Sequence, residues 1–218
     1  MRPGLWFRIV VCLAVVGSVS GCIGAVDRAE FEDRIRSRGG GLVSALPLSA
    51  VSAVEKRTGA TDLEVNLILL TPPNSTQFRL VLNDQPAQVT RFLSGGDDMT
   101  AREPTVRLRV RPPDRSRQLD DYSFTLGDLS SPKPVRVSAA DDLDGEDFTV
   151  SEVPGLSHLE EIVDAAMSRS GLPDGEVTVL VVSRFGRDIR IVANVASPRS
   201  ELVVEFDRTG AFLRMEQG

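Results

Sequence analysis

Residues 175–218 constrain the fold most, because four strand-like segments follow one another there with very short connections. The connections are Phe185-Gly186-Arg187, Ser197-Pro198-Arg199 and Asp207-Arg208-Thr209-Gly210. Parallel strands need a crossover of a dozen residues or more, so strands joined this closely form hairpins. The sequence therefore predicts an antiparallel meander whose strands span 176–183, 188–195, 201–206 and 211–215.

A helix is predicted immediately before this meander. Gly171 marks its end, and Ser157 with Glu160 has the spacing of a capping box at its start. The apolar stripe that would pack on the sheet recurs at helical spacing and consists of Leu156, Leu159, Ile162, Val163, Ala166 and Met167.

The first half of the chain has a similar order. A helix is expected over 47–58, closed by Gly59, after an earlier helix over 27–38 that ends at Gly39-Gly40-Gly41. The segments that alternate or run apolar, and that we expect to be strands, are 63–70, 77–82, 87–93, 105–111, 121–126 and 135–137.

The two halves share an internal match at one offset of 112 residues. Arg57-Thr58-Gly59 corresponds to Arg169-Ser170-Gly171, and Glu64-Val65 corresponds to Glu176-Val177. We therefore expect an α+β protein of two tandem units, each a helix packed on a mainly antiparallel four-stranded sheet. Chance similarity of two α+β halves is the alternative, and whether the units form one sheet or two is open.

The N-terminus has the features of a targeting segment. Arg2 and Arg8 flank a short positive start, an apolar run over 9–16 follows, and Val19-Ser20-Gly21-Cys22 ends in small residues. This is the layout of a secretory signal, and the apolar run is too short to span a bilayer.

The last four of these residues resemble the lipobox of bacterial lipoproteins. That resemblance implies cleavage after residue 21 and a diacylglyceryl group on the sulfur of Cys22. The only other cysteine, Cys12, lies in the removed segment, so no disulfide is available to the mature chain. An ordinary cleaved signal is the alternative.

These observations divide the chain into five parts: signal peptide 1–21, lipidated tether and first helix 22–46, first α+β module 47–138, acidic linker 139–155 and second α+β module 156–218. Cleavage removes two of 25 basic residues and none of 31 acidic ones, which leaves a net charge of −8. That balance disfavours nucleic acid as a partner. Only Lys56 and Lys133 are lysines, a skew that hints at a high-GC, actinobacterial source.

Catalytic and metal-binding sets are missing from the pattern. His158 is the only histidine, and Ser130-Ser131-Pro132-Lys133 matches S-x-x-K without the partner motifs that such chemistry needs. The acidic run 141–147 lacks the spacing of an EF-hand, so a solvated linker is favoured over a calcium site. We expect no catalytic residues, no metal and no cofactor.

One set of side chains remains a candidate contact for an anionic ligand or a partner protein. Alternation over 105–111 places three arginines on one side of a strand, and two more follow in the next loop: Arg107, Arg109, Arg111, Arg115 and Arg117. The alternative is the ordinary solvated face of an antiparallel strand.

Two further resemblances concern the body. Phe206-Asp207-Arg208-Thr209-Gly210-Ala211-Phe212 resembles the closing hairpin of PepSY-like exported modules. The chain as a whole is similar to an uncharacterised family of actinobacterial envelope lipoproteins through Arg38-Gly39-Gly40-Gly41, the stretch 106–111, Leu119-Asp120-Asp121-Tyr122 and Pro134-Val135. These resemblances imply an envelope location and a binding or accessory role, and they supply no catalytic residue.

The sequence thus predicts a membrane-anchored extracytoplasmic lipoprotein that is not an enzyme. It would act as a binding or accessory module of the cell envelope and contact the membrane through the lipid on Cys22. The alternative is a carrier of a lipid or other apolar ligand in a cavity between helix and sheet.

Overall fold

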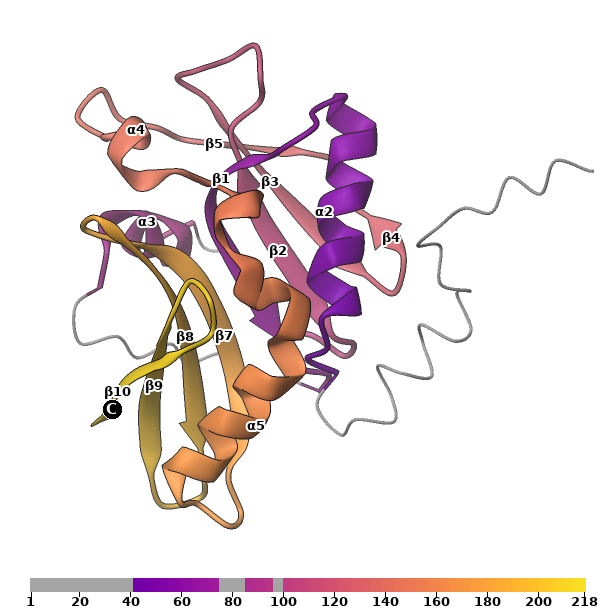
Figure 1. Ribbon diagram of the computed structural model, residues 1–218. Coiled ribbons are helices and arrows are strands. Elements are labelled where there is room, and N and C mark those ends of the chain that lie inside the picture. Colours follow the sequence, from indigo (N-terminus) through magenta and orange to yellow (C-terminus); the bar gives the residue numbers. More distant parts are fainter. Residues whose placement is uncertain (1–40, 75–84, 96–99) are drawn as a thin grey trace, which may run out of the picture.

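The described part of the chain folds around one antiparallel sheet of ten strands. The computed structural model describes residues 41–74, 85–95 and 100–218. The sheet order is β10-β9-β8-β7-β1-β2-β3-β4, with β5 beside β3 and β6 beside β1 (Figure 1). The strands are β1 Glu64–Thr71, β2 Thr105–Val110, β3 Leu119–Thr125, β4 Asp128–Leu129, β5 Lys133–Val135, β6 Phe148–Thr149, β7 Glu176–Phe185, β8 Asp188–Ala196, β9 Glu201–Asp207 and β10 Phe212–Gln217.

The expected α+β class is confirmed, and strands from both halves share one continuous sheet. Four α-helices accompany it in the described residues: α2 Ala45–Thr58, α3 Ala87–Leu93, α4 Leu143–Glu146 and α5 Leu159–Ser170. Both long helices end where predicted, because Gly59 and Gly171 adopt the left-handed conformation (φ 74° and 63°) that closes a helix.

Helices α2 and α5 cover the same face of the sheet (Figure 1). Leu46, Ala50 and Val54 of α2 are completely buried, as are Leu159 and Ala166 of α5. They meet the alternate residues of the strands that point to this face, so each helix buries one stripe against the sheet. The interface between helix and sheet is therefore filled by side chains.

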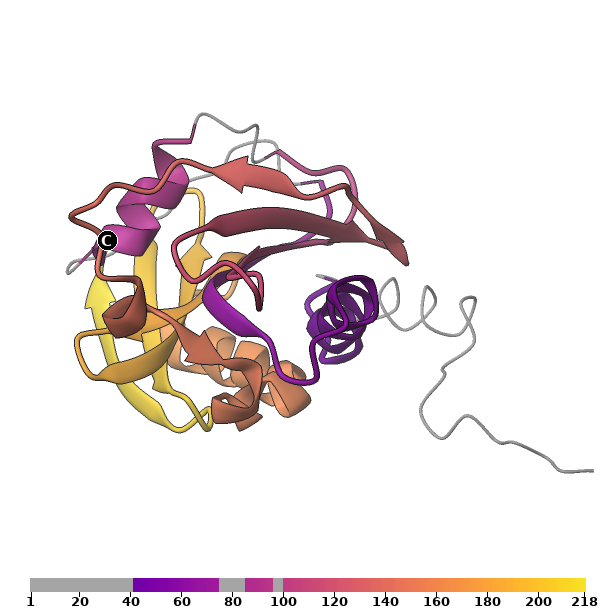
Figure 2. The same cartoon turned by 90° about the horizontal axis from the view of Figure 1, so that it is seen from above.

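The opposite face is covered at its centre by α3. Val89 and Phe92 of α3 pack on the β1 residues Leu67 and Leu69, and Figure 2 shows α2 and α3 on opposite sides of the strands. The prediction of a strand over 87–93 is wrong. The segment starts after Pro86, and its two buried apolar residues are three apart, which is helical spacing.

Strands β1 and β7 join the two halves at the centre of the sheet. Leu69 lies opposite Val181, flanked by the pairs Ile68 with Val182 and Leu70 with Leu180. All of these residues are fully buried. Residues 69 and 181 are separated by 112 positions, which is also the offset of the sequence match.

The start of α5 differs from its prediction. The capping box at Ser157 is wrong, because a 3₁₀ turn occupies Pro154–His158 and the Ser157 hydroxyl donates to the carbonyl of Pro154 (2.7 Å). Ser44, just before α2, takes the capping role. Its hydroxyl oxygen accepts from the amide of Leu159 (2.8 Å), and the hydroxyl also donates to Glu160.

The chain enters the body through a buried segment next to Ser44. Leu42 and Val43 are only 5% and 2% exposed. Gly41 has a positive φ of 64°, and a Cβ there would lie 2.8 Å from a carbon of Pro104. Cys22, the predicted helix over 27–38 and the predicted strand over 77–82 lie outside the described residues.

Candidate functional site

The predicted arginine face of β2 is built into the fold. Arg109 is only 2% exposed and lies opposite Asp121 of β3. Its Nε and Nη2 atoms donate to the two carboxylate oxygens of Asp121, each at 2.8 Å. The guanidinium carbon is 4.9 Å from the centre of the Phe92 ring in α3. A paired, covered guanidinium of this kind holds α3 on the sheet and is not presented to solvent.

Arg111 is engaged in the same way. Its Nε atom lies 2.7 Å from Asp147 Oδ2, and its Nη1 atom lies 2.8 Å from Asp144 and 3.5 Å from Glu64. The expectation that Arg109 and Arg111 form an open anion site therefore has to be corrected. Alternation placed them on one face correctly, but α3 and α4 cover that face.

The acidic run over 141–147 supplies the matching charges. Arg91 of α3 pairs with Asp141 (2.9 Å) and with Glu146 (2.8 Å). The Asn66 amide of β1 donates to Asp147 Oδ1 (2.8 Å). Part of the expected linker 139–155 is thus α4, and its carboxylates are ion-paired structural groups. Strand β6 and the 3₁₀ turn Val150–Glu152 continue it along β1.

The other three arginines of the predicted set lie apart from these pairs. Arg107 is half-buried on β2, with its Nη1 atom 3.4 Å from the Thr71 hydroxyl. Arg115 and Arg117 are exposed and contact Gln118 and the backbone carbonyls of 138–139, respectively. The structure therefore does not bring the five predicted residues together into one binding surface.

Asp147 carries an unusual charge balance. Burial raises its pKa above the ordinary value of 3.8, and this effect exceeds the opposing influence of the Asn66 hydrogen bond and the positive charge of Arg111. The geometry explains why the positive charge of Arg111 does not outweigh the effect of burial on the Asp147 pKa. Although Nε and Oδ2 are 2.7 Å apart, neither atom has an aligned hydrogen bond. Asp147 is therefore a structural carboxyl whose charged form costs free energy.

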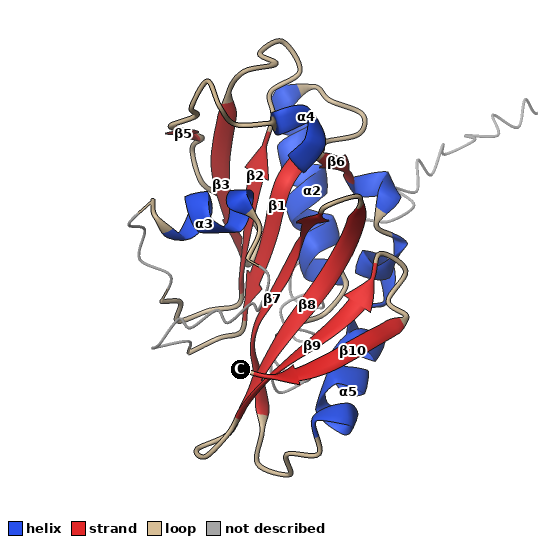
Figure 3. Ribbon diagram, turned by 90° about the vertical axis from the view of Figure 1, so that its left-hand side faces the viewer, coloured by secondary structure: helices blue, strands red, loops and turns tan. Residues whose placement is uncertain are grey.

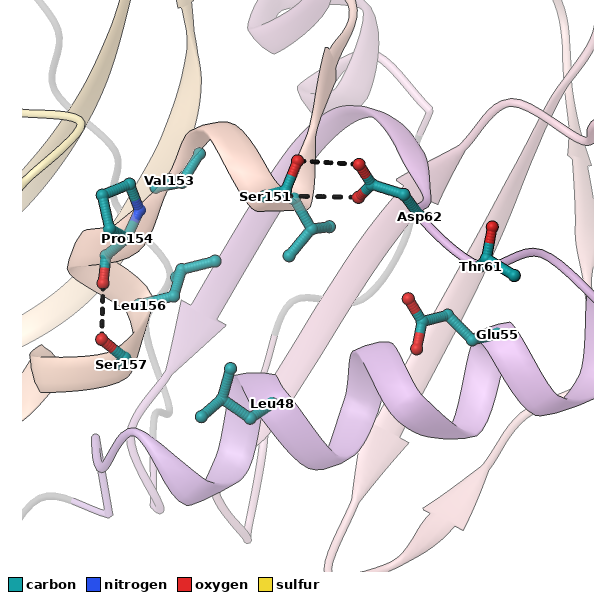
Figure 4. Close-up of a pocket in the computed structure, with 10 residues that line it drawn as sticks. Leu48, Glu55, Thr61, Asp62, Ser151, Val153, Pro154, Leu156 and Ser157 are labelled. Atoms are coloured by element: carbon teal, nitrogen blue, oxygen red, sulfur yellow. Dashed lines mark hydrogen bonds between the residues drawn. The ribbon is translucent and has the colours of Figure 1, made fainter. Parts of the chain in front are cut away.

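A groove lies between α2 and the 3₁₀ segments that precede α5 (Figure 4). It has a volume of about 440 Å³. Its apolar wall combines one exposed side chain of α2 with residues of the 3₁₀ segments, and its polar rim contains two carboxylates and three hydroxyls. The apolar residues are Leu48, Val150, Val153, Pro154 and Leu156, and the polar ones are Glu55, Thr61, Asp62, Ser151 and Ser157.

The two carboxylates of the groove differ in their surroundings. Asp62 accepts from the hydroxyl (2.7 Å) and the amide (3.3 Å) of Ser151. The Glu55 carboxylate has no hydrogen-bond or ion-pair partner among the described residues. Partial burial raises its pKa, and the nearby charge of Asp62 raises it further. Leu48 and Glu55 are seven residues apart on α2, so an apolar and an acidic group point into the groove from one helix face. This combination suits a positively charged group carried on an apolar chain.

A second recess, of about 770 Å³, lies where the β7–β8 and β9–β10 hairpins approach each other. Several of its charged side chains are already paired. Glu205 binds Arg190 (2.9 Å) and Arg214 (2.8 Å), and Arg184 donates to the backbone carbonyl of Asp147 (3.0 Å). Sequence reasoning missed this cluster because its residues come from separate hairpins.

The remaining sequence candidates have structural surroundings. The His158 Nε2 atom is 2.7 Å from the carbonyl of Thr209, so the ring links the start of α5 to the β9–β10 turn. The Ser130 hydroxyl accepts from the amide of Ser123 (2.8 Å). Within 41–74, 85–95 and 100–218, no group of three or more His, Cys, Asp or Glu side chains is placed to hold a metal ion. In the same part of the chain, no helix is long and apolar enough to cross a membrane.

Comparisons with known proteins identify no family. No family model matches the chain, and no curated protein matches it. Among solved structures, a candidate lipoprotein from Clostridium difficile 630 is similar over 81% of this chain and 94% of its own, with 12% identity and a TM-score of 0.46.

Replacing Arg109 with Gln should destabilise the protein strongly. The change leaves the Asp121 carboxylate without its partner and removes the cover on Phe92, so we expect a loss of about 3 kcal/mol in the free energy of unfolding. Arg115→Gln is the matched control, because Arg115 is exposed, and it should change stability by less than about 0.5 kcal/mol. Urea denaturation measures both. Equal effects would show that the buried pair contributes nothing.

The raised pKa of Asp147 predicts a pH dependence with a definite sign. Between its ordinary value and its raised value the folded state binds the proton more tightly than the unfolded chain. The stability contributed by this group is therefore lost as the pH rises through that interval. Asp147→Asn removes the titration, so its free energy of unfolding, relative to wild type, should increase from about pH 4 to neutrality.

Asp144→Asn controls for the loss of one negative charge beside Arg111. Urea denaturation across the pH range compares the three proteins. A relative stability of Asp147→Asn that falls with increasing pH would mean that Arg111 and Asn66 outweigh burial.

Proposed function

We propose that the protein is a non-catalytic binding or accessory module, held on the extracytoplasmic face of the cell membrane by a lipid on Cys22. The leader with its Val19-Ser20-Gly21-Cys22 ending supports the anchor. The absence of any cysteine after residue 22 also supports it, because a lone thiol at the cleavage point has no disulfide partner within the mature chain. Two acyl chains on one residue are enough for stable anchoring.

The groove beside α2 carries the binding part of the proposal. Its decisive feature is Glu55, a half-buried carboxylate that has no ion-pair partner in the described residues and stands next to apolar side chains. The chemistry of the groove favours a basic side chain that is flanked by apolar ones on an envelope polypeptide. Such a group would pair with Glu55 while its neighbours cover Leu48, which is 43% exposed.

We infer two tandem units, α2 with the strands from β1 onward and α5 with β7–β10, which are related by an approximate two-fold axis. The pairing of residues 69 and 181 supports this, since both the sequence match and the central pair have the offset of 112. The groove lies beside the connection between these units.

A carrier of an apolar ligand is the second candidate. The apolar wall of the groove favours it, but the interface between helix and sheet does not, since Leu46, Ala50 and Val54 fill the space under α2. Native mass spectrometry of the purified body would reveal a co-purifying ligand if the protein were such a carrier.

The anchor predicts the location of a Cys22 variant. Cys22→Ala removes the acceptor sulfur, so the exported protein should move from the membrane fraction to the soluble extracytoplasmic fraction. Fractionation followed by immunoblotting checks this. A variant that stays with the membrane after its leader has been removed would contradict the lipid anchor.

The groove predicts a selective loss of binding. As a probe we would use a short peptide of alternating leucine and arginine, with a leucine and glutamate peptide of the same length for comparison. Glu55→Gln should weaken binding of the basic peptide by about tenfold, which corresponds to about 1.4 kcal/mol. Titration calorimetry or fluorescence anisotropy measures the affinity.

The matched control is Glu161→Gln, which removes the same charge from the exposed side of α5, outside the groove. It should change the affinity only slightly. An equal loss in both variants would show that the peptide follows net charge, and the groove would then not be the binding site.

A further inference from the structure

The two edges of the sheet are protected unequally. At one edge, β4 has two residues and β5 has three, and β5 contains Pro134, which has no amide proton to offer a neighbouring strand. At the other edge, β10 has six residues and no proline. In the part of the chain that the structure describes, β10 pairs with β9 alone (Figure 3). A long edge strand of this kind is a ready template for another strand.

This edge is also where apolar side chains are exposed. Four large hydrophobic side chains stand out as exposed in the described residues, and three of them belong to β10: Phe212 at 36%, Leu213 at 49% and Met215 at 41%. Arg169 of α5 lies over the Phe212 ring at 3.9 Å and holds it beside the edge. The apolar surface of the described body is thus concentrated where backbone groups are unpaired.

The outward backbone groups can be identified from the pairing with β9. The amide of Gly218 donates to the carbonyl of Glu201 (3.0 Å), and residue 217 lies opposite residue 202. Hydrogen-bonded positions alternate along an antiparallel ladder. The amide and carbonyl groups of Met215 and Gln217 therefore point away from β9.

We propose that β10 pairs antiparallel with β10 of a second copy of the chain, with Met215 opposite Met215. Within one copy Arg214 pairs with Glu216 (2.7 Å) and with Glu205 (2.8 Å). In the proposed register Arg214 of each copy additionally faces Glu216 of the other, and Leu213 faces Gln217, so opposite charges stay together across the pair. Centring the pair on Arg214 or on Glu216 would instead place like charges opposite each other, which destabilises a sheet. The order Arg-Met-Glu is therefore self-complementary about Met215, and this property selects a second copy as the occupant of the edge.

The geometry is one that the fold already contains. At the centre of the sheet, β1 and β7 pair antiparallel about residues 69 and 181, with α2 and α5 on the same face. A two-fold axis through Met215 would repeat this arrangement at the edge. It would join two ten-stranded sheets into one and bury the exposed side chains of both β10 strands.

The test is disulfide trapping in membranes that contain the full-length lipoprotein. Directly opposite residues in such a pair have Cα atoms about 5.5 Å apart, which lies in the range of about 4.4–6.8 Å that a disulfide accepts. Met215→Cys should therefore give a covalent dimer under mild oxidation. Leu213→Cys alone and Gln217→Cys alone should not, because each would lie about 13 Å from its own counterpart. Combining the last two substitutions in one chain should restore the dimer.

The wild-type chain is the control: it would reveal any disulfide-linked dimer that forms through Cys22. Two further outcomes would overturn the proposal: crosslinking at 213 as efficient as at 215, or a crosslinked product whose mass identifies a different polypeptide.

A second variant tests the association without a crosslink. In the body released by Cys22→Ala, Met215→Lys places two like charges opposite each other and should weaken dimerisation at least tenfold in sedimentation equilibrium, with urea denaturation of the monomer little changed. A released body that remains monomeric at about 0.1 mM, with or without this substitution, would overturn the proposal as well. The inference is independent of the groove and of its peptide.

Discussion

The pairing of β1 with β7 is the constraint on which the rest of the structure depends. The strands meet through residues that are completely buried, so neither face at this point can be left to water. α2 and α5 are needed on one side, and α3 is needed on the other. β1 and β7 are the strands at which the N-terminal and C-terminal parts of the sheet meet, and their pairing joins these parts into one sheet.

The charges on the second face follow from this burial. α3 lies across the sheet and removes the Arg109 guanidinium from water. The free-energy cost of this desolvation is offset by the two hydrogen bonds to Asp121 and by the ring of Phe92. The acidic run after β5 serves the same layer through Arg91 and Arg111. Two features of opposite charge that look in the sequence like separate surfaces are thus one structural unit.

The sequence predicted what depends on local order. Alternation found the strands of the C-terminal meander, and glycine at 59 and 171 marked the ends of both long helices. It failed where a distant contact decides the outcome. A stretch as short as 87–93 fits a helix or a strand, and packing of Val89 and Phe92 on β1 selects the helix.

The cap of α5 comes from Ser44, more than a hundred residues away, so no local motif could reveal it. The arginines of β2 were assigned to the correct face, but their cover comes from elements that are remote in the sequence.

The clamped entry segment at Gly41–Ser44 has a mechanical consequence. Leu42 and Val43 are buried and Ser44 is bonded to α5, so the body holds the chain firmly at this point. The linker between Cys22 and the folded body is therefore limited to the residues before Gly41. Nineteen peptide units separate Cys22 from Gly41, and a chain of that length reaches at most about 65 Å when fully extended. If Cys22 carries the proposed lipid, Gly41 cannot lie farther than this from the membrane, and any force on the lipidated end enters the fold where α2 and α5 both begin.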